Sequence, residues 1–150
     1  MKTTYVVITP VRDEGAIIGE TIASMAEQTL RPAQWIIVDD GSTDNTREVI
    51  EQAAQEHDWI RCVYRTDRGR RLAGTGVICA FNEGYGALSV GNWDYIVKLD
   101  ADLSFEPGYF ASCFSRFEEN DSIGIAGGIV GYRENGEFVP EALSDPPFHV

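Results

Sequence analysis

Short apolar runs recur along the first hundred residues, and each is followed by a segment with helical spacing. Residues 5–9 (YVVIT) form a continuous, mostly β-branched run closed by Pro10, the pattern of a strand buried on both faces of a sheet. Similar runs occupy residues 35–38, 59–64 and 95–99. Strands that alternate with helices predict an α/β fold with a mostly parallel central sheet flanked by helices, of Rossmann-like type.

The segments between these runs have the apolar spacing of helices that cover a sheet. In the first segment, Ile18, Ile22 and Met25 fall on one helical stripe. Ser42 or Thr43 can cap the second helix. Further along, we expect helices at residues 77–88 and 107–117, a fifth strand at residues 123–130, and a hairpin over residues 131–138 that turns near Asn135-Gly136.

Length and charge limit the class of protein. The 150 residues suffice for one core, so we expect a single domain over residues 1–150. A formal charge of −12 argues against a nucleic-acid partner or a polybasic membrane module, because both need a cationic surface. No stretch approaches the ~18–20 apolar residues of a membrane span, and none resembles an export signal. We therefore expect a cytoplasmic protein, or a membrane-associated one if the chain is part of a longer protein.

Polar and charged residues that could bind a ligand follow each predicted strand. Residues 9–14 follow the first strand, Asp39 and Asp40 the second, a basic loop the third, and Asp100 and Asp102 the fourth. Because parallel strands end at the same edge of a sheet, and ligands bind beyond that edge, we expect one site there.

The acidic pair and the basic loop suggest a cation and an anion. Asp100 and Asp102, two residues apart, can converge on one hard divalent cation. Five of the twelve basic residues lie between residues 61 and 71, a concentration that suits a phosphate ligand. Two ordinary interpretations stay open: a solvated acidic turn, and a loop whose arginines pair with nearby acids.

Taken together, the motifs resemble those of the inverting glycosyltransferases of family 2, which have the GT-A nucleotide-sugar-binding fold. The resemblance is carried by VVITPVRDE at residues 6–14, VDDGSTDNT at 38–46, AFNEG at 80–84 and LDAD at 99–102, in the family's order. The VDDGSTDNT block is the most specific of these motifs.

The resemblance implies that the chain binds a nucleoside-diphosphate sugar, with UDP favoured over GDP, for transfer to a carbohydrate or lipid-linked acceptor. Thr9, Pro10, Arg12 and Glu14 would line the pocket for the base and ribose. Asp39 would accept a hydrogen bond from an N–H of uracil or guanine.

The resemblance also implies how the diphosphate is held. Arg70 or Arg71 would approach the diphosphate. Asp100 would contact the ribose or metal-bound water, and Asp102 would ligate the Mn²⁺ or Mg²⁺ that bridges the two phosphates. Asp40 would support the turn.

The chain departs from the family pattern at two positions near the phosphates. Phe81 stands where the family often has a basic residue, which leaves more of the phosphate binding to the arginine loop. Leu103 stands where an acid is common, which leaves Asp102 as the main metal ligand. No base motif follows Asp102, so we expect the general base outside this chain and a domain truncated on its acceptor side.

Two other functions stay open at this point. A catalytically silent nucleotide-sugar-binding domain would have the same donor motifs. A haloacid-dehalogenase-type phosphatase is suggested by residues 100–104, which approximate its nucleophile motif, but such enzymes need a later lysine and this chain has none after Lys98.

Overall fold

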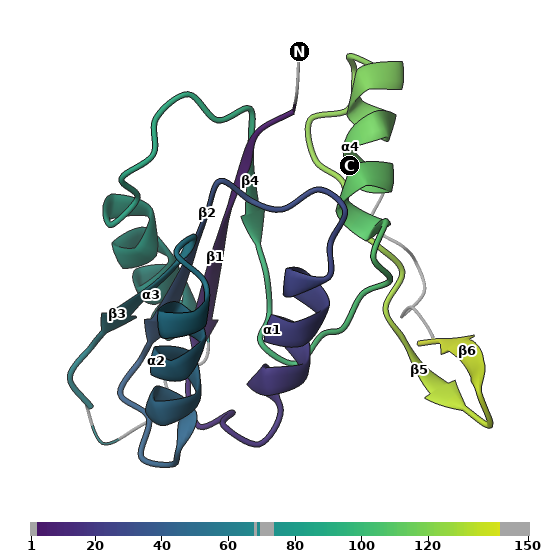
Figure 1. Ribbon diagram of the computed structural model, residues 1–150. Coiled ribbons are helices and arrows are strands. Elements are labelled where there is room, and N and C mark those ends of the chain that lie inside the picture. Colours follow the sequence, from purple (N-terminus) through teal and green to yellow (C-terminus); the bar gives the residue numbers. More distant parts are fainter. Residues whose placement is uncertain (1–2, 68, 70–73, 142–150) are drawn as a thin grey trace. The chain divides into compact units, whose positions relative to one another are not determined.

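The computed structural model describes residues 3–67, 69 and 74–141 (Figure 1). The chain divides into two compact units, residues 1–111 and residues 112–150. Among the described residues, no helix has both the length and the apolar character needed to cross a membrane.

The first unit is built on a four-stranded sheet in the order β3-β2-β1-β4. All three neighbouring pairs of strands are parallel. The predicted α/β fold with a mostly parallel sheet is therefore confirmed. The strands are β1 (Tyr5–Val11), β2 (Gln34–Asp39), β3 (Ile60–Tyr64) and β4 (Tyr95–Lys98).

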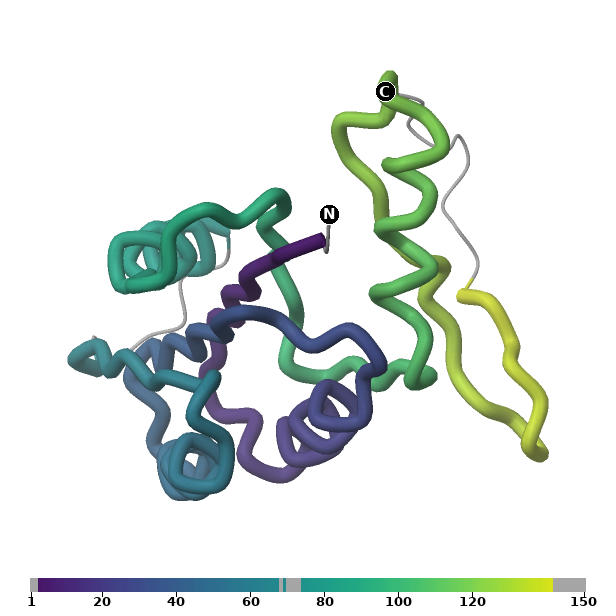
Figure 2. The backbone as a smooth tube through the Cα atoms, turned by 45° about the horizontal axis from the view of Figure 1, so that its top comes forward, coloured from purple at the N-terminus to yellow at the C-terminus, as the bar shows by residue number. Residues whose placement is uncertain are grey.

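Helices cover both faces of this sheet. Helices α1 (Ile18–Ala26) and α2 (Thr46–Glu56) lie side by side on one face, and α3 (Thr75–Gly86) lies on the other (Figures 1 and 2). A fourth helix, α4 (Tyr109–Glu119), starts in the first unit and ends in the second. Two-sided coverage explains why β1 and β2 are almost uniformly apolar rather than alternating.

The two central strands form the core of the first unit. Trp35 and Tyr5 are among its largest fully buried side chains. Nε1 of Trp35 donates to Oγ1 of Thr9 at 2.9 Å, and the hydroxyl of Tyr5 donates to the carbonyl of Leu30 at 2.7 Å. No buried side-chain nitrogen or oxygen of the described residues lacks a hydrogen-bond partner, so these polar atoms are buried without an unpaired donor or acceptor.

The second unit confirms one prediction and corrects another. The expected hairpin forms from β5 (Gly131–Glu134) and β6 (Glu137–Pro140). Asn135 and Gly136 have φ of 51° and 86°, as a type I′ turn requires. The predicted strand at residues 123–130 is wrong: this segment has no regular structure, and Ile125 is 90% exposed. Three glycines in eight residues weaken a strand, and the segment pairs in no ladder with another described strand, although the N–H of Glu141 donates to the carbonyl of Val130 at 2.8 Å.

Gly84 lets α3 approach the sheet. A Cβ at this position would lie 2.6 Å from Cγ2 of Ile8 and 2.9 Å from Cγ2 of Val38. We predict that Gly84→Ala lowers the free energy of unfolding by about 1–3 kcal/mol, because the added methyl group overpacks the core. Urea denaturation followed by tryptophan fluorescence measures this.

The matched control is Gly86→Ala in the same helix. Apart from its chain neighbours and the backbone of the helix itself, no atom of the described residues lies within 4 Å of a Cβ built there, so this substitution should be neutral or stabilise by up to about 1 kcal/mol. Equal destabilisation by both substitutions would contradict the close packing of α3.

Candidate functional site

The four parallel strands bring the predicted site residues to one edge of the sheet. Arg12 and Glu14 follow β1, Asp39 ends β2, and Asp100 and Asp102 follow β4. The chain passes from β1 through β2 to β3 on one side, and then returns to β4 on the other side of β1. This reversal of strand order at β1 is where open α/β sheets bind ligands.

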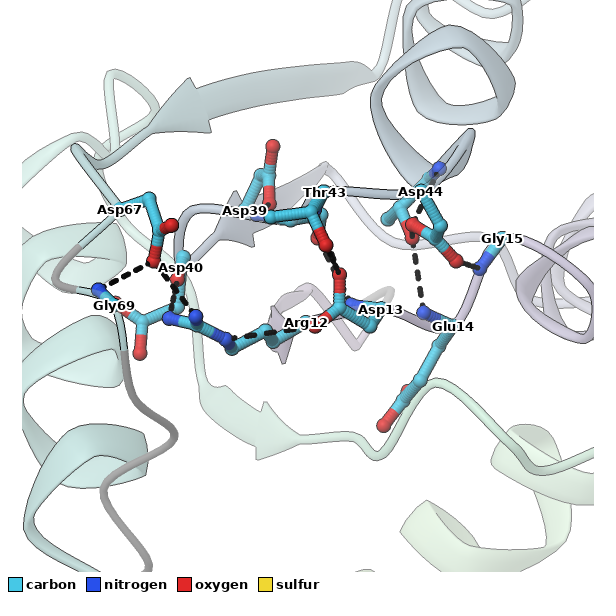
Figure 3. A network of polar contacts seen from close by, with 12 residues as sticks. Arg12, Asp13, Glu14, Gly15, Asp39, Asp40, Thr43, Asp44, Asp67 and Gly69 are labelled. Carbon is cyan, nitrogen blue, oxygen red and sulfur yellow. Dashed lines mark hydrogen bonds and ion pairs between the residues drawn. The ribbon is translucent and has the colours of Figure 1, made fainter.

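Arg12 connects the loops that follow three of these strands (Figure 3). Its Nη1 donates to the carbonyl of Asp40 at 2.8 Å, and its Nη2 donates to Oδ1 of Asp67 at 2.7 Å. Nε lies 3.6 Å from Oδ2 of Asp13. The hydrogen bond with Asp67 raises the pKa of Arg12 and outweighs the effect of desolvation. The side chain is only 9% exposed, so in this structure it holds loops together instead of facing an open pocket.

The loop after β1 is also bound by the turn after β2. Asp13 has φ of 54°, and its Oδ1 accepts from the N–H of Thr43 at 2.7 Å, while its own N–H donates to Oγ of Ser42 at 3.0 Å. The prediction that Ser42 or Thr43 caps α2 is therefore wrong. The helix begins after Asn45, because the side chains earlier in the turn bind Asp13 instead.

Asp44 extends this connection toward α1 (Figure 3), and Thr46 adds to it. Oδ2 of Asp44 accepts from the N–H of Gly15 at 3.1 Å, and Oγ1 of Thr46 accepts from the N–H of Glu14 at 2.9 Å. Oδ1 of Asp44 also accepts from the N–H of Thr46 at 3.0 Å. Much of the VDDGSTDNT block therefore stabilises the neighbouring loop by side-chain hydrogen bonds to its backbone.

Gly41 allows the turn after β2 to touch the loop after β3. It has φ of 78°, and a Cβ there would lie 2.5 Å from Cα of Asp67. A side chain at this position would be strained in its backbone conformation and would also collide with the facing loop. Steric constraints therefore explain why the VDDGSTDNT block has glycine at position 41.

Of the two basic-loop arginines that the structure describes, Arg65 pairs with acids, whereas Nη1 of Arg61 donates to the carbonyl of Ala87 at 2.9 Å. Nη1 of Arg65 lies 2.5 Å from Oδ1 of Asp40, and its Nε lies 2.8 Å from Oε2 of Glu83. Asp40 therefore stabilises the turn region, and Glu83 gives the AFNEG motif a structural contact. Arg70 and Arg71, predicted to approach the diphosphate, lie outside the described residues.

A pocket of about 360 Å³ opens beside the end of β2. Oδ1 of Asp39 accepts from the N–H of Ser42 at 2.8 Å, and its Oδ2 lies 3.9 Å from Nε of Arg47. Asp39 is only 2% exposed, so its carboxylate sits at the inner wall of the pocket. The pocket is lined by Asp39, Gly41, Ser42, Arg47, Tyr64, Arg65, Thr66 and Asp67.

Of these lining residues, only Asp39 is a site residue that the sequence predicts, and Arg47 and Tyr64 belong to none of the motifs quoted for the site. Cζ of Arg47 lies 4.1 Å from the centre of the Tyr64 ring. Tyr64 is the last residue of β3. Its position at the end of a strand is the sequence signal that could have indicated its place in the pocket. Arg47 follows directly after the VDDGSTDNT block, where a charged residue in the first helical turn is typical of a solvated surface.

The first strand contributes less to an open site than predicted. Thr9 is fully buried, and its Oγ1 accepts the hydrogen bond from Trp35. The Thr9 side chain faces the core because β1 is a central strand with helices on both faces, and its place in the base and ribose pocket stays a prediction. Pro10 and Glu14 are half-buried, and neither lines the pocket beside Asp39.

The acidic turn after β4 carries two exposed carboxylates. Ala101 between them is buried, and its carbonyl accepts from Oγ1 of Thr21 at 2.7 Å, which fixes the turn to α1. Asp100 forms an ion pair with Lys98. Asp102 has no hydrogen bond or ion pair with another described residue.

These two carboxylates fit an open divalent-metal site. The described residues contain no group of three or more potential metal ligands, so this part of the chain offers no closed cage. Mg²⁺ and Mn²⁺ suit such a site, because carboxylate oxygens can hold them while water and phosphate oxygens complete the coordination.

The hydrogen bonds of Asp44 predict a pH dependence of stability. Burial raises the pKa of this carboxyl, but hydrogen bonds from Thr46 and Gly15 outweigh it and lower the pKa below its ordinary value of 3.8. The ionised carboxylate therefore stabilises the fold above pH 3.8, and this stabilisation is lost as the pH falls through the lower folded-state pKa.

We predict that Asp44→Ala lowers the free energy of unfolding at pH 7 by about 0.5–1.5 kcal/mol. The difference from wild type should shrink as the pH falls below 3.8, as measured by urea denaturation at a series of pH values. Asp58→Ala removes an exposed carboxylate that has no hydrogen bond or ion pair with another described residue, and this control should behave like wild type. A constant difference for Asp44→Ala at every pH would contradict the role of its charge.

Curated proteins of similar sequence are glycosyltransferases. The chain is 26% identical over 129 residues to glycosyltransferase GlyG of Streptococcus pneumoniae serotype 4, covering 86% of this chain and 40% of GlyG. It is 26% identical over 116 residues to poly-beta-1,6-N-acetyl-D-glucosamine synthase of Staphylococcus epidermidis, covering 77% of this chain and 26% of that protein. The chain thus spans well under half the length of these relatives.

Solved structures of similar fold include complexes with nucleotide sugars. S. aureus TarS 1-349 in complex with UDP-GlcNAc aligns with a TM-score of 0.59 at 17% identity, over 85% of this chain and 38% of the TarS 1-349 chain. The mannosyltransferase PcManGT from Pyrobaculum calidifontis, in complex with GDP-Man and Mn²⁺, aligns with a TM-score of 0.52 at 22% identity, over 70% of this chain and 29% of that chain. At these identities, the likeness establishes the GT-A fold.

The family assignment comes from the sequence as a whole. The model of glycosyl transferase family 2 matches residues 6–148, which is nearly the entire chain. The match includes the turn after β2, the acidic turn after β4 and residues 112–148 of the second unit. The chain belongs to glycosyl transferase family 2.

Proposed function

We propose that this chain is the donor-binding part of an inverting glycosyltransferase. It binds a nucleoside-diphosphate sugar, UDP-linked rather than GDP-linked, for transfer of the sugar to a hydroxyl of a carbohydrate or lipid-linked acceptor. The observation that supports this most strongly is the pocket at Asp39, a nearly buried carboxylate at the same sheet edge as two exposed ones.

In this proposal, Asp39 binds the nucleobase. Its Oδ2 makes no hydrogen bond to a described residue, whereas its Oδ1 is engaged by Ser42. A carboxylate oxygen at a pocket wall is an acceptor for a ring N–H. The complexes of TarS with UDP and UDP-GlcNAc support a UDP donor, while the GDP-Man complex of PcManGT makes GDP the alternative.

Asp102, with Asp100 beside it, would hold the divalent cation, Mn²⁺ or Mg²⁺. When bound, such a cation neutralises charge on a departing diphosphate. The Mn²⁺ in the PcManGT complex supports this assignment. The Lys98 ammonium that pairs with Asp100 would have to share that carboxylate, so Asp102 is the principal ligand in this proposal.

The remaining predicted contacts stay part of the proposal. Pro10, Arg12 and Glu14 would support the base and ribose through the loop after β1, with Arg12 acting through its bridge to Asp67. Arg70 and Arg71 stay predictions for the diphosphate. We also propose that the general base and the acceptor side lie outside residues 1–150. A cytoplasmic location stays a prediction.

A catalytically silent nucleotide-sugar-binding domain is the second candidate. It would bind the donor in the same pocket and release no nucleoside diphosphate from a UDP-sugar in the presence of acceptor. Membership of family 2 removes the support for a phosphatase.

Calorimetric titration of UDP and GDP, each with and without Mn²⁺, tests the donor site. We predict that Mn²⁺ strengthens UDP binding at least tenfold and that Asp102→Asn abolishes this gain, because the cation links the carboxylate to the diphosphate. Binding without Mn²⁺ should be the same in both proteins.

The matched control is Asp58→Asn, an exposed carboxylate near the start of β3, at the opposite end of the strand from the site. It should bind UDP as the wild type does. Absence of nucleotide binding by the wild type would defeat the proposed function. A full Mn²⁺ effect in Asp102→Asn would defeat the metal assignment.

A further inference from the structure

Arg47 is the arginine of the pocket whose donors are not engaged by described residues. Arg65 is bound by Asp40 and Glu83. In contrast, Nε of Arg47 lies 3.9 Å from Oδ2 of Asp39 and 4.0 Å from Oε1 of Glu51. Both distances exceed a hydrogen bond, so the guanidinium retains its donors for a ligand.

Asp39 and Arg47 therefore place an acceptor and a donor side by side in one pocket. Asp39 comes from the end of β2, and Arg47 from the first turn of α2. The carboxylate is almost entirely buried, while the arginine is 51% exposed. A buried acceptor with a neighbouring cation discriminates strongly among ligands, because a wrong ligand leaves a desolvated polar group unpaired.

The face of the Tyr64 ring positions the guanidinium. Cζ of Arg47 lies 4.1 Å from the ring centre, within the range of a cation–π contact. Burial, together with the neighbouring Cys62 and Glu51, raises the pKa of Tyr64. The Tyr64 hydroxyl therefore stays protonated at neutral pH. Tyr64 adds no negative charge that would compete with Asp39 for the Arg47 guanidinium.

We propose that Asp39 and Arg47 together read the hydrogen-bonding edge of the donor's nucleobase, and that Arg47 is a specificity-determining residue. This inference rests on the proposed function and adds the base that the pocket selects. Asp39 accepts from a ring N–H, and Arg47 donates to the carbonyl oxygen next to it. Uracil presents this pair of groups.

The other bases fit this pair less well. Cytosine would direct a ring-nitrogen lone pair at the carboxylate and an amino group at the guanidinium, so both contacts would be unfavourable. Guanine has a ring N–H beside a carbonyl, but its amino group is a second donor on the same edge. Oδ1 of Asp39 already accepts from Ser42, which leaves that donor poorly matched. The expected order of affinity is UDP, then GDP, then CDP.

Calorimetric titration of UDP, GDP and CDP in the presence of Mn²⁺ tests this order. The wild type should bind UDP about 100-fold more tightly than CDP, the scale expected when one or two buried polar groups are left unpaired. Arg47→Met keeps the aliphatic stem and removes the guanidinium. We expect UDP affinity to fall about tenfold and the UDP-to-CDP ratio to fall at least tenfold.

Two further variants separate this role from a general effect of charge. Arg47→Lys retains a donor and a positive charge, and should keep most of the UDP-to-CDP ratio. Arg116→Met removes an exposed arginine from α4, whose ion pair with Glu119 is also on the surface, and should change none of the three affinities. Thermal unfolding checks that each variant is folded.

The outcomes distinguish this inference from the proposed function. If the wild type binds UDP but Arg47→Met keeps the wild-type UDP-to-CDP ratio, the specificity role of Arg47 is overturned and the donor site stands. The same conclusion follows if Arg47→Met weakens all three nucleotides equally. If the wild type binds none of them, the proposed function fails.

Discussion

The arrangement of the site depends on one buried guanidinium. Arg12 donates to the Asp40 carbonyl and to the Asp67 carboxylate, and these partners lie on loops that follow different strands. A charged group with so little exposure is tolerated only when its donors are satisfied. Arg12 therefore ties the loop after β1 to the loops after β2 and β3, and the pocket lies between the latter two.

The acidic residues have three different roles in the structure. Asp13, Asp44 and Asp67 accept hydrogen bonds from the backbone of neighbouring loops or pair with Arg12. Asp39 presents one oxygen to the pocket, and Asp102 stands exposed in the turn after β4. Exposed acids such as Asp58 and Glu119 lie on the solvated surface. The carboxylates that shape the site are therefore separate from those proposed to bind the donor and its cation.

The sequence allowed the sheet and its active edge to be predicted, because fully apolar runs identify buried parallel strands and such strands end together. It did not allow side-chain directions to be predicted. Thr9 lies in a strand that leads to the site, yet its hydroxyl faces Trp35 in the core. Arg47 resembles a solvated helix residue in sequence, and only its approach to Asp39 and Tyr64 indicates a role. The strand expected at residues 123–130 failed because periodicity does not supply a pairing partner.

Amide chemical shifts recorded while UDP and Mg²⁺ are added to the ¹⁵N-labelled protein test the central claim most directly, that the strand-end loops form one nucleotide site. The largest changes should fall at residues 39–42, 64–67 and 100–102, at the ends of β2, β3 and β4. Residues 57–60, near the start of β3 at the opposite end of that strand, should stay unchanged. Changes centred there, or no changes at the three loops, would contradict this account.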